Sequence, residues 1–154
     1  MSSDRVKKFL SAFGAEGRVR EFPVSSATVE LAAAALSTTP SRIAKTMSFL
    51  LKEGPIVVVA AGNTKIDNAK FKAAFGEKAR MIPAADVERI VGYPVGGVCP
   101  FGVNEGVKIF LDTGLKRFDT VFPACGSANS AAEMTPEELE RFTGGAWTDV
   151  CRLV

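Results

Sequence analysis

Two apolar runs joined by a Glu-Gly turn constrain the fold of this chain more than any other feature of its sequence. The first run covers residues 43–51, and the second, residues 56–61, consists of isoleucine, valine and alanine. β-branched residues favour strands, and Glu53-Gly54 between the runs is typical of a tight turn. We therefore expect an antiparallel β-hairpin, with Lys45 near the start of its first strand.

The rest of the chain mixes helical and strand patterns without a strict alternation of the two. Helices are expected over residues 4–13, 28–36, 67–75 and 84–91 and again from residue 135, and strands over residues 18–22, 79–82, 107–111, 120–124 and 147–153. This order favours an α+β fold, in which helices pack on a mixed sheet or open barrel, over a doubly wound nucleotide-binding fold.

Length and composition fit one folded domain that spans residues 1–154. Compact domains usually have about 100–150 residues. A hydrophobic content of 47% and a charged content of 23% are typical of a chain that buries a core. The longest apolar stretch, residues 56–61, is far below the ~20 residues needed to cross a bilayer. We expect a soluble, cytoplasmic protein with no membrane partner.

The three cysteines do not form a recognisable disulfide or metal pattern. Cys99, Cys125 and Cys151 are odd in number, widely spaced and free of any Cys-x-x-Cys pair. This spacing argues against a disulfide framework and against a zinc site. A reducing compartment and a chain without bound metal are expected.

The chain contains no histidine, and this excludes a large set of mechanisms. Ser-His catalysis, Cys-His catalysis and histidine-ligated metal sites all require an imidazole. Catalysis would have to rely on lysine, carboxylates, hydroxyls, backbone amides or the substrate itself. The net charge of +2 is too small for a protein that coats a nucleic-acid duplex, although it is compatible with a local basic rim.

Lys45 is the first candidate functional residue. In an extended strand it shares a face with Met47 and Phe49, because side chains alternate between the two faces. A cation among apolar side chains either reaches solvent at the sheet edge or provides a fixed charge for an anionic or carbonyl group. The pattern leaves both interpretations open.

Two loops are candidate binding segments. Residues 92–106 contain five glycines and two prolines, a density that breaks regular structure and can expose backbone amides to a carbonyl or phosphate oxygen. Residues 125–130, Cys-Gly-Ser-Ala-Asn-Ser, offer hydroxyl and amide donors. Each segment could also be an ordinary turn. Cys99 and Cys125 are expected to be small buried hydrophobes, because no histidine activates them.

Four motifs occur in a characteristic order along the chain. They are Lys45-Thr46, the Gly-Tyr-x-x-Gly-Gly-x-x-Pro-Phe-Gly run over residues 92–102, Phe110-Leu111-Asp112, and Glu-Met-Thr-Pro-Glu-Glu-Leu over residues 133–139. Together they resemble the YbaK/EbsC family, with a match from about residue 9 to residue 151. That family includes free-standing aminoacyl-tRNA deacylases related to the editing insertion domain of bacterial prolyl-tRNA synthetase.

The resemblance implies a mixed α/β fold built on a curved, barrel-like sheet. The implied activity is hydrolysis of the ester between a wrong amino acid and the terminal ribose of tRNA, typically the tRNA for proline, with no metal or organic cofactor. The implied partner is the acceptor end of an aminoacyl-tRNA, with an aminoacyl-tRNA synthetase as a further candidate. An aminoacyl ester is already activated, so its hydrolysis needs orientation and oxyanion stabilisation more than a dedicated base.

The resemblance also assigns roles to matching positions. Lys45 would anchor the terminal adenosine and stabilise negative charge at the scissile ester, and Gly102 would supply the backbone amide beside the reacting carbonyl. Phe101 would line the amino-acid pocket. The other expected substrate-binding residues are Thr46, Asp112, Gly126 and Ser127.

The second loop departs from the family pattern. Many members carry Gly-Gly-Lys-Arg-Gly where residues 125–129 of this chain read Cys-Gly-Ser-Ala-Asn. The rejected amino acid therefore stays open among alanine, cysteine and serine. We expect Ala- or Cys-tRNA(Pro), with a slight preference for alanine because this loop is built of small polar residues.

Two other interpretations remain. One is a non-catalytic nucleic-acid-binding or synthetase-associated module of the same fold, which a basic rim of Arg18, Arg20, Arg42 and Lys45 would serve equally well. The other is a cysteine-dependent thiol or redox enzyme, which would require a thiol of low pKa.

Overall fold

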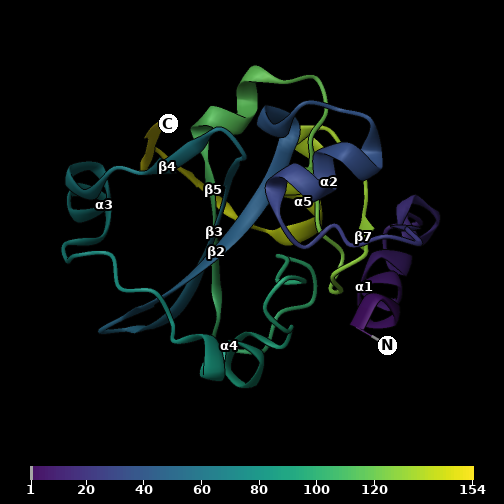
Figure 1. The fold of residues 1–154 in the computed structure, drawn as a ribbon. Helices are drawn as coiled ribbons and strands as arrows, with labels where there is room; N and C mark the ends of the chain where they lie inside the picture. The colour runs from purple at the N-terminus through teal and green to yellow at the C-terminus, as the bar shows by residue number, and fades with distance from the viewer. Residues whose placement is uncertain (1) are drawn as a thin grey trace.

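The structure, a computed structural model, describes residues 2–154, and a mixed sheet that curls into half a barrel runs through its centre (Figure 1). The strands of this sheet, in spatial order, are β6 (Phe122–Pro123), β2 (Ile43–Leu51), β3 (Gly54–Ala61), β5 (Lys108–Asp112) and β8 (Ala146–Thr148). β2 and β3 form an antiparallel hairpin, whereas the β2–β6, β3–β5 and β5–β8 pairs are parallel. The expected hairpin and the α+β class are confirmed.

Two short antiparallel ribbons lie beside the central sheet. β1 (Arg20–Glu21) pairs with β7 (Ser130–Ala131), and β4 (Thr64–Ile66) pairs with β9 (Cys151–Leu153). β4 follows β3 after a short turn, which brings the β4–β9 ribbon close to the beginning of β2. No pattern in the sequence predicted β4 or β7, because strands of two or three residues are too short to show a periodicity.

Three of the described α-helices begin at a capping side chain. The helices are α1 (Ser2–Ser11), α2 (Val29–Leu36), α3 (Asn68–Phe75), α4 (Ala84–Val91) and α5 (Pro136–Thr143), with short 3-10 helices at Glu16–Arg18, Pro40–Arg42 and Thr113–Arg117. Thr28, Asp67 and Thr135 each accept a hydrogen bond from a first-turn N–H, and Thr135 forms a reciprocal capping box with Glu138. The expected helices are confirmed, with ends shifted by a few residues. None of the helices in residues 2–154 has the length and apolar character needed to span a membrane.

The core lies on both faces of the sheet. Residues 56–61 of β3 are each at most 3% exposed, which explains why this strand reads as a continuous apolar run rather than an alternating one. On one face Val59 belongs to a cluster with Phe142 of α5, and on the other Val58 packs with Phe71 of α3. Helices therefore hold the hairpin from both sides, which fixes the strand that carries Lys45.

The expected strand over residues 79–82 is wrong, because this segment makes only an isolated bridge between Met81 and Phe49. A hydrogen bond from the Ile82 N–H to the Ser48 carbonyl (3.1 Å) holds it along the outer edge of β2. The segment is therefore an edge contact of the central sheet rather than a strand of its own.

The expected strand over residues 147–153 is split into β8 and β9. Asp112, at the end of β5, accepts hydrogen bonds from the N–H groups of Val150 (3.0 Å) and Cys151 (3.2 Å). This contact lies between the two strands, so that β8 stays in the central sheet and β9 pairs with β4. The strands expected over residues 18–22 and 120–124 shorten to β1 and β6.

Candidate active site

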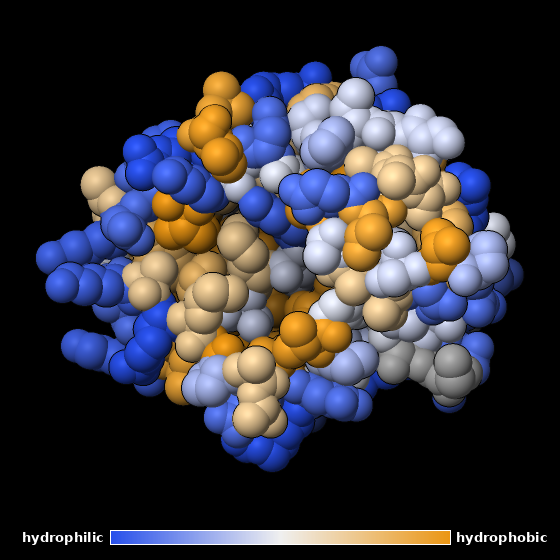
Figure 2. Space-filling view, viewed as in Figure 1, coloured by the Kyte–Doolittle hydropathy of each residue, from blue (hydrophilic) through white to orange (hydrophobic). Residues whose placement is uncertain are grey.

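A cavity of about 430 Å³ opens at the outer edge of β2. β2 pairs with β6 at Ile43 and Ala44, and with the segment around Met81 from Ser48 onwards, so residues 45–47 face a gap between these two contacts. The cavity is lined by residues 26–29, 43–48, 81–82, 95–96 and 130–131, and by Ala32, Ala84, Val87, Val98, Phe122 and Ala124. Figure 2 shows the surface hollowed near the middle of this face, with apolar side chains around the hollow.

Lys45 is the ionisable residue of this lining, since the other described lining residues are apolar or carry hydroxyl groups. Its side chain is half-buried, and burial lowers the pKa of its ammonium group, against smaller raising effects of Cys151 and Glu30. The ammonium donates a hydrogen bond to the main-chain carbonyl of Thr64 on β4. An ammonium has three donors, so two remain for a ligand.

Thr46 contributes two kinds of unpaired group. Its hydroxyl oxygen is buried and has no hydrogen-bond partner among residues 2–154. Its main chain also faces the gap. Along an antiparallel strand, the N–H and C=O groups of successive residues point alternately to the neighbouring strand on one side and on the other. In β2 the Ser48 carbonyl points outward, away from β3, and accepts a hydrogen bond from the Ile82 N–H. The N–H and C=O of Thr46, two residues earlier, therefore point outward as well. Buried polar groups normally find a partner, so a ligand in the cavity is a natural partner for these two main-chain groups.

The glycine run forms the opposite wall. Gly96 has a φ of +94°, a backbone conformation that favours glycine, and it lines the cavity. At Gly97 an added Cβ would lie 2.7 Å from main-chain atoms of Gly126 and Ser127. The two loops that the sequence singled out are thus packed backbone against backbone at Gly97, whereas Gly96 is favoured by its positive φ.

Hydroxyl groups of the second loop, residues 125–130, lie next to the wall formed by the glycine run. Ser130, 1% exposed, lines the cavity and its hydroxyl lies 2.6 Å from that of Ser127. Ser26 also lines the cavity and donates to the Ala128 carbonyl at 3.3 Å. Ser127 therefore supports the wall through Ser130, and Gly126 through Gly97, without either residue forming part of the lining.

The structure places Gly102 and Phe101 outside the cavity lining. The Gly102 carbonyl accepts a hydrogen bond from the Arg5 Nε (2.9 Å), and an added Cβ there would lie 3.3 Å from Phe9. Phe101 is fully buried in the core, with its ring centroid 6.5 Å from that of Phe9. Both residues pack against α1, so the structure does not bring them together with Lys45.

Asp112 also lies outside the lining. Its carboxylate is 2% exposed and is occupied by three backbone amides, those of Val150, Cys151 and Gly114 at 3.0, 3.2 and 3.0 Å. A carboxylate that accepts this many N–H groups has little capacity left for a substrate. The contacts of Asp112 are structural, because they hold β9 and the turn after β5.

Gly96, Ser130 and Ser26 are cavity residues that the sequence did not single out individually. The Gly-Gly pair was visible in the sequence, but the spacing of five glycines does not tell which of them faces a ligand. Ser130 is placed at the site by the two-residue pairing of β7 with β1, in which it lies opposite Glu21. A strand this short has no pattern by which the sequence could predict it.

The cysteines are buried and outside the lining. Burial raises the pKa of Cys99 to about 12 and raises that of Cys125 as well. Such thiols are poor nucleophiles near neutral pH, which argues against a thiol enzyme. Residues 2–154 contain no group of three or more His, Cys, Asp or Glu side chains placed to hold a metal ion.

The three arginines of the expected basic rim make contacts within the protein and do not line the cavity. Arg18 pairs with Glu138 at 2.5 Å, Arg42 binds the Thr120 carbonyl at 3.1 Å, and Arg20 lies over the ring of Phe22. Of the four residues of that rim, Lys45 alone lines the cavity.

Comparison with known proteins gives a consistent result. Residues 24–142 match the family model of the aminoacyl-tRNA editing domain. The chain is 49% identical to YwhH of Bacillus subtilis over 155 residues, which cover 99% of this chain and 98% of YwhH. It is 28% identical to EbsC of Enterococcus faecalis, named as a Cys-tRNA(Pro)/Cys-tRNA(Cys) deacylase, with 80% of this chain and 76% of EbsC covered.

The fold matches a solved structure over almost its full length. A crystal structure described as a trans-editing enzyme for prolyl-tRNA synthetase superposes with a TM-score of 0.89 at 28% identity. The superposition covers 98% of this chain and 97% of the other. The fold expected from the four motifs is thereby confirmed.

Proposed function

Since the chain belongs to the aminoacyl-tRNA editing domain family, we propose that it hydrolyses the ester that joins a wrongly attached amino acid to the terminal ribose of tRNA. One observation carries the proposal: Lys45 faces a cavity in which every other described lining residue is apolar or carries a hydroxyl group. A fixed positive charge in such surroundings stabilises an oxyanion more strongly than it would in water.

The reaction needs few protein groups. Water adds to the ester carbonyl, the carbonyl oxygen takes up negative charge, and the bond to the ribose oxygen breaks as that oxygen receives a proton. Lys45 is placed to stabilise the oxyanion with a donor not used by Thr64, and the outward N–H of Thr46 lies beside it. The lining has no carboxylate or imidazole, so proton transfer falls to water and to the substrate's own vicinal hydroxyl.

The backbone amide expected from Gly102 is assigned here to the segment at Gly96. Gly96 lines the cavity on the side opposite β2, whereas Gly102 packs on α1. Gly96 has a positive φ, and the next residue, Gly97, packs on the backbone of the second loop, so the segment is preorganised, which is what oxyanion stabilisation requires. Thr46 is assigned to the substrate, and Ser127 and Gly126 to support of the wall.

The amino acid proposed to be removed is alanine or cysteine, as expected from the small polar residues of the second loop. The hydroxyl of Thr46 does not select between them, because it is buried and has no surface that a ligand in the cavity could contact.

The proposed partner is the acceptor end of aminoacyl-tRNA in the cytoplasm, and prolyl-tRNA synthetase is the proposed source of the mischarged product. A non-catalytic binding module of the same fold is the alternative. Turnover decides between them: purified protein is assayed against Ala-, Cys- and Ser-tRNA(Pro), with Lys45→Ala as control. Release of one of these amino acids by the wild type and its loss in the variant support the proposal, and binding without release supports the module.

A further inference from the structure

Two basic residues stand directly opposite each other on the β4–β9 ribbon. Lys65 of β4 is the register partner of Arg152 of β9, and both side chains are exposed. Neither has an ion-pair partner among residues 2–154. Like charges directly across an antiparallel pair destabilise it, so this arrangement works against the ribbon rather than for it. It calls for an explanation outside the fold.

The pair lies next to the candidate site. Lys65 follows Thr64, whose carbonyl accepts the hydrogen bond from the Lys45 ammonium. Thr64 is 4% exposed and faces the interior, so alternation along β4 turns Lys65 to the solvent. The Lys65 main chain is thus bonded directly to the carbonyl group that holds the Lys45 ammonium.

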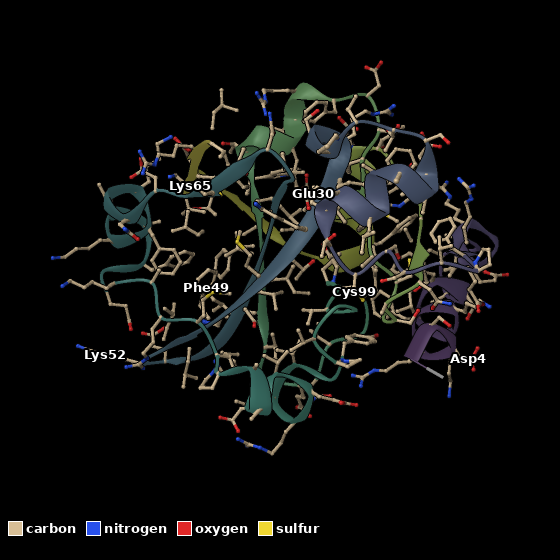
Figure 3. The ribbon with its side chains drawn as sticks, in the orientation of Figure 1. Asp4, Glu30, Phe49, Lys52, Lys65 and Cys99 are labelled. Atoms are coloured by element: carbon tan, nitrogen blue, oxygen red, sulfur yellow. The ribbon has the colours of Figure 1, made fainter. Side chains whose placement is uncertain are left out.

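The segment that carries Lys65 has more positive charge than the chain as a whole. Residues 64–80 contain five basic and two acidic residues, a net charge of +3, whereas the whole chain has +2. Arg80, at the end of this segment, precedes Met81 in the cavity lining. Figure 3 shows Lys65 and Lys52 on one side of the molecule with α3 between them, and Asp4 of α1 on the opposite side. Residues 64–80 therefore give this side of the molecule a net positive charge next to the ribbon.

We propose that Lys65 and Arg152 bind backbone phosphates of the RNA strand whose 3′ end enters the cavity. The proposal rests on the proposed function, because that function brings an RNA end to Lys45. Two cations held side by side match successive phosphates, and such contacts provide affinity and position without reading sequence. A bound phosphate also relieves the repulsion between the two side chains.

The test uses charge reversal with a matched control. Lys65→Glu places a carboxylate opposite Arg152, and Arg152→Glu does the reverse, so the ribbon is expected to keep or gain thermal stability. Lys8→Glu on α1, exposed and far from the ribbon, makes the same change in net charge. KM and kcat are measured on the mischarged tRNA that the wild type hydrolyses fastest, at several salt concentrations, and on a 3′-aminoacyl adenosine, which has the ester but no phosphate.

Each reversal at the ribbon is expected to raise KM for tRNA about tenfold with kcat unchanged, and to reduce the slope of log(kcat/KM) against log salt by about 0.7–0.9. Hydrolysis of the adenosine ester and all values for Lys8→Glu should match the wild type. Unchanged KM and salt slope in both ribbon variants, or equal losses in Lys8→Glu, would overturn the proposal and leave the deacylase standing.

Failure of the proposed function gives a different result. If the wild type releases no amino acid from any ester, fluorescence anisotropy with uncharged tRNA decides the phosphate contact on its own. Weaker tRNA binding by both ribbon variants than by Lys8→Glu then supports the contact, and equal binding overturns it.

Discussion

The ammonium group of Lys45 donates a hydrogen bond to the main-chain carbonyl of Thr64. Thr64 is itself fixed, because its hydroxyl donates to the Ala61 carbonyl (2.7 Å) and its strand pairs with β9. The charge of the site is therefore aimed by the turn between β3 and β4, which follows the hairpin in sequence. A cation held in this way needs little reorganisation when a substrate oxygen develops negative charge.

Replacing Lys45 by alanine should lower the deacylation rate by at least about 100-fold, since one oxyanion-type donor contributes about 2.7–4 kcal/mol to the transition state. Single-turnover release of the amino acid measures this. Lys45→Met, which keeps the aliphatic stem, separates lost charge from lost packing and should be equally slow. A Lys45→Ala protein with wild-type turnover would contradict the assignment.

Replacing Thr46 by valine should keep or raise the stability of the protein. It removes a buried hydroxyl without a partner among residues 2–154, so the free energy of unfolding should stay the same or rise, by up to about 1–3 kcal/mol. The ratio of kcat/KM for Ser-tRNA(Pro) and Ala-tRNA(Pro) should stay unchanged, because the hydroxyl has no surface that a ligand could contact. Urea unfolding and paired kcat/KM measurements test both. A changed ratio would show that the hydroxyl reaches the substrate.

The deacylation rate should depend on the charge of Lys45 at alkaline pH. Burial lowers the pKa of its ammonium below the ordinary value of 10.5, so kcat/KM should fall with a midpoint below that pH after subtraction of spontaneous hydrolysis. The folded state then binds fewer protons than the unfolded state between the two pKa values. The contribution of this group to the free energy of unfolding therefore increases as the pH rises through that window. A Lys45→Ala profile with the same alkaline fall would assign the titration to another group.

Replacing Gly97 by alanine should push two loops apart. The new Cβ would lie 2.7 Å from main-chain atoms of Gly126 and Ser127, which cannot move as a side chain can. The free energy of unfolding should fall by about 1–3 kcal/mol, the usual cost of overpacking, and kcat/KM should fall with it. Gly17→Ala is the control, because nothing lies within 4 Å of its added Cβ. Equal behaviour of the two variants would show that the loop contact is not tight.

Replacing Asp112 by asparagine tests whether this residue is structural. Losing charged hydrogen bonds to the amides of Val150 and Cys151 should lower the free energy of unfolding by about 1.5–3 kcal/mol. KM for aminoacyl-tRNA should stay unchanged at a temperature where the variant is folded. The exposed residue Asp119, changed to asparagine, is the control. A raised KM with wild-type stability would restore Asp112 to the substrate-binding set.

The sequence predicts those parts of the fold that local chemistry decides. The hairpin follows from its apolar runs and its turn, and the starts of α3 and α5 follow from Asp67 and Thr135, whose side chains cap the chain locally. Asp112 shows the opposite case: it splits a seven-residue strand pattern, because its carboxylate takes amides that lie 38 and 39 residues away. No local pattern contains that contact.

The site shows the same division. Lys45 and Thr46 reach the cavity because they lie on a strand whose alternation is visible in the sequence. Within the glycine run, packing against other elements decides which glycine lines the cavity. Gly102 packs against α1, and Gly97 packs against the second loop. Choosing Gly96 over Gly102 therefore required the tertiary structure.

The gap in the outer edge of β2 also bears on the solubility of the protein. Open strand edges recruit further strands and lead to aggregation. Here the open stretch is three residues, roughly 10 Å at ~3.3 Å per residue, and it presents a single N–H and a single C=O, those of Thr46. Paired chain borders it on both sides. An edge this short admits an ester but offers a foreign strand too few hydrogen bonds to begin a fibril.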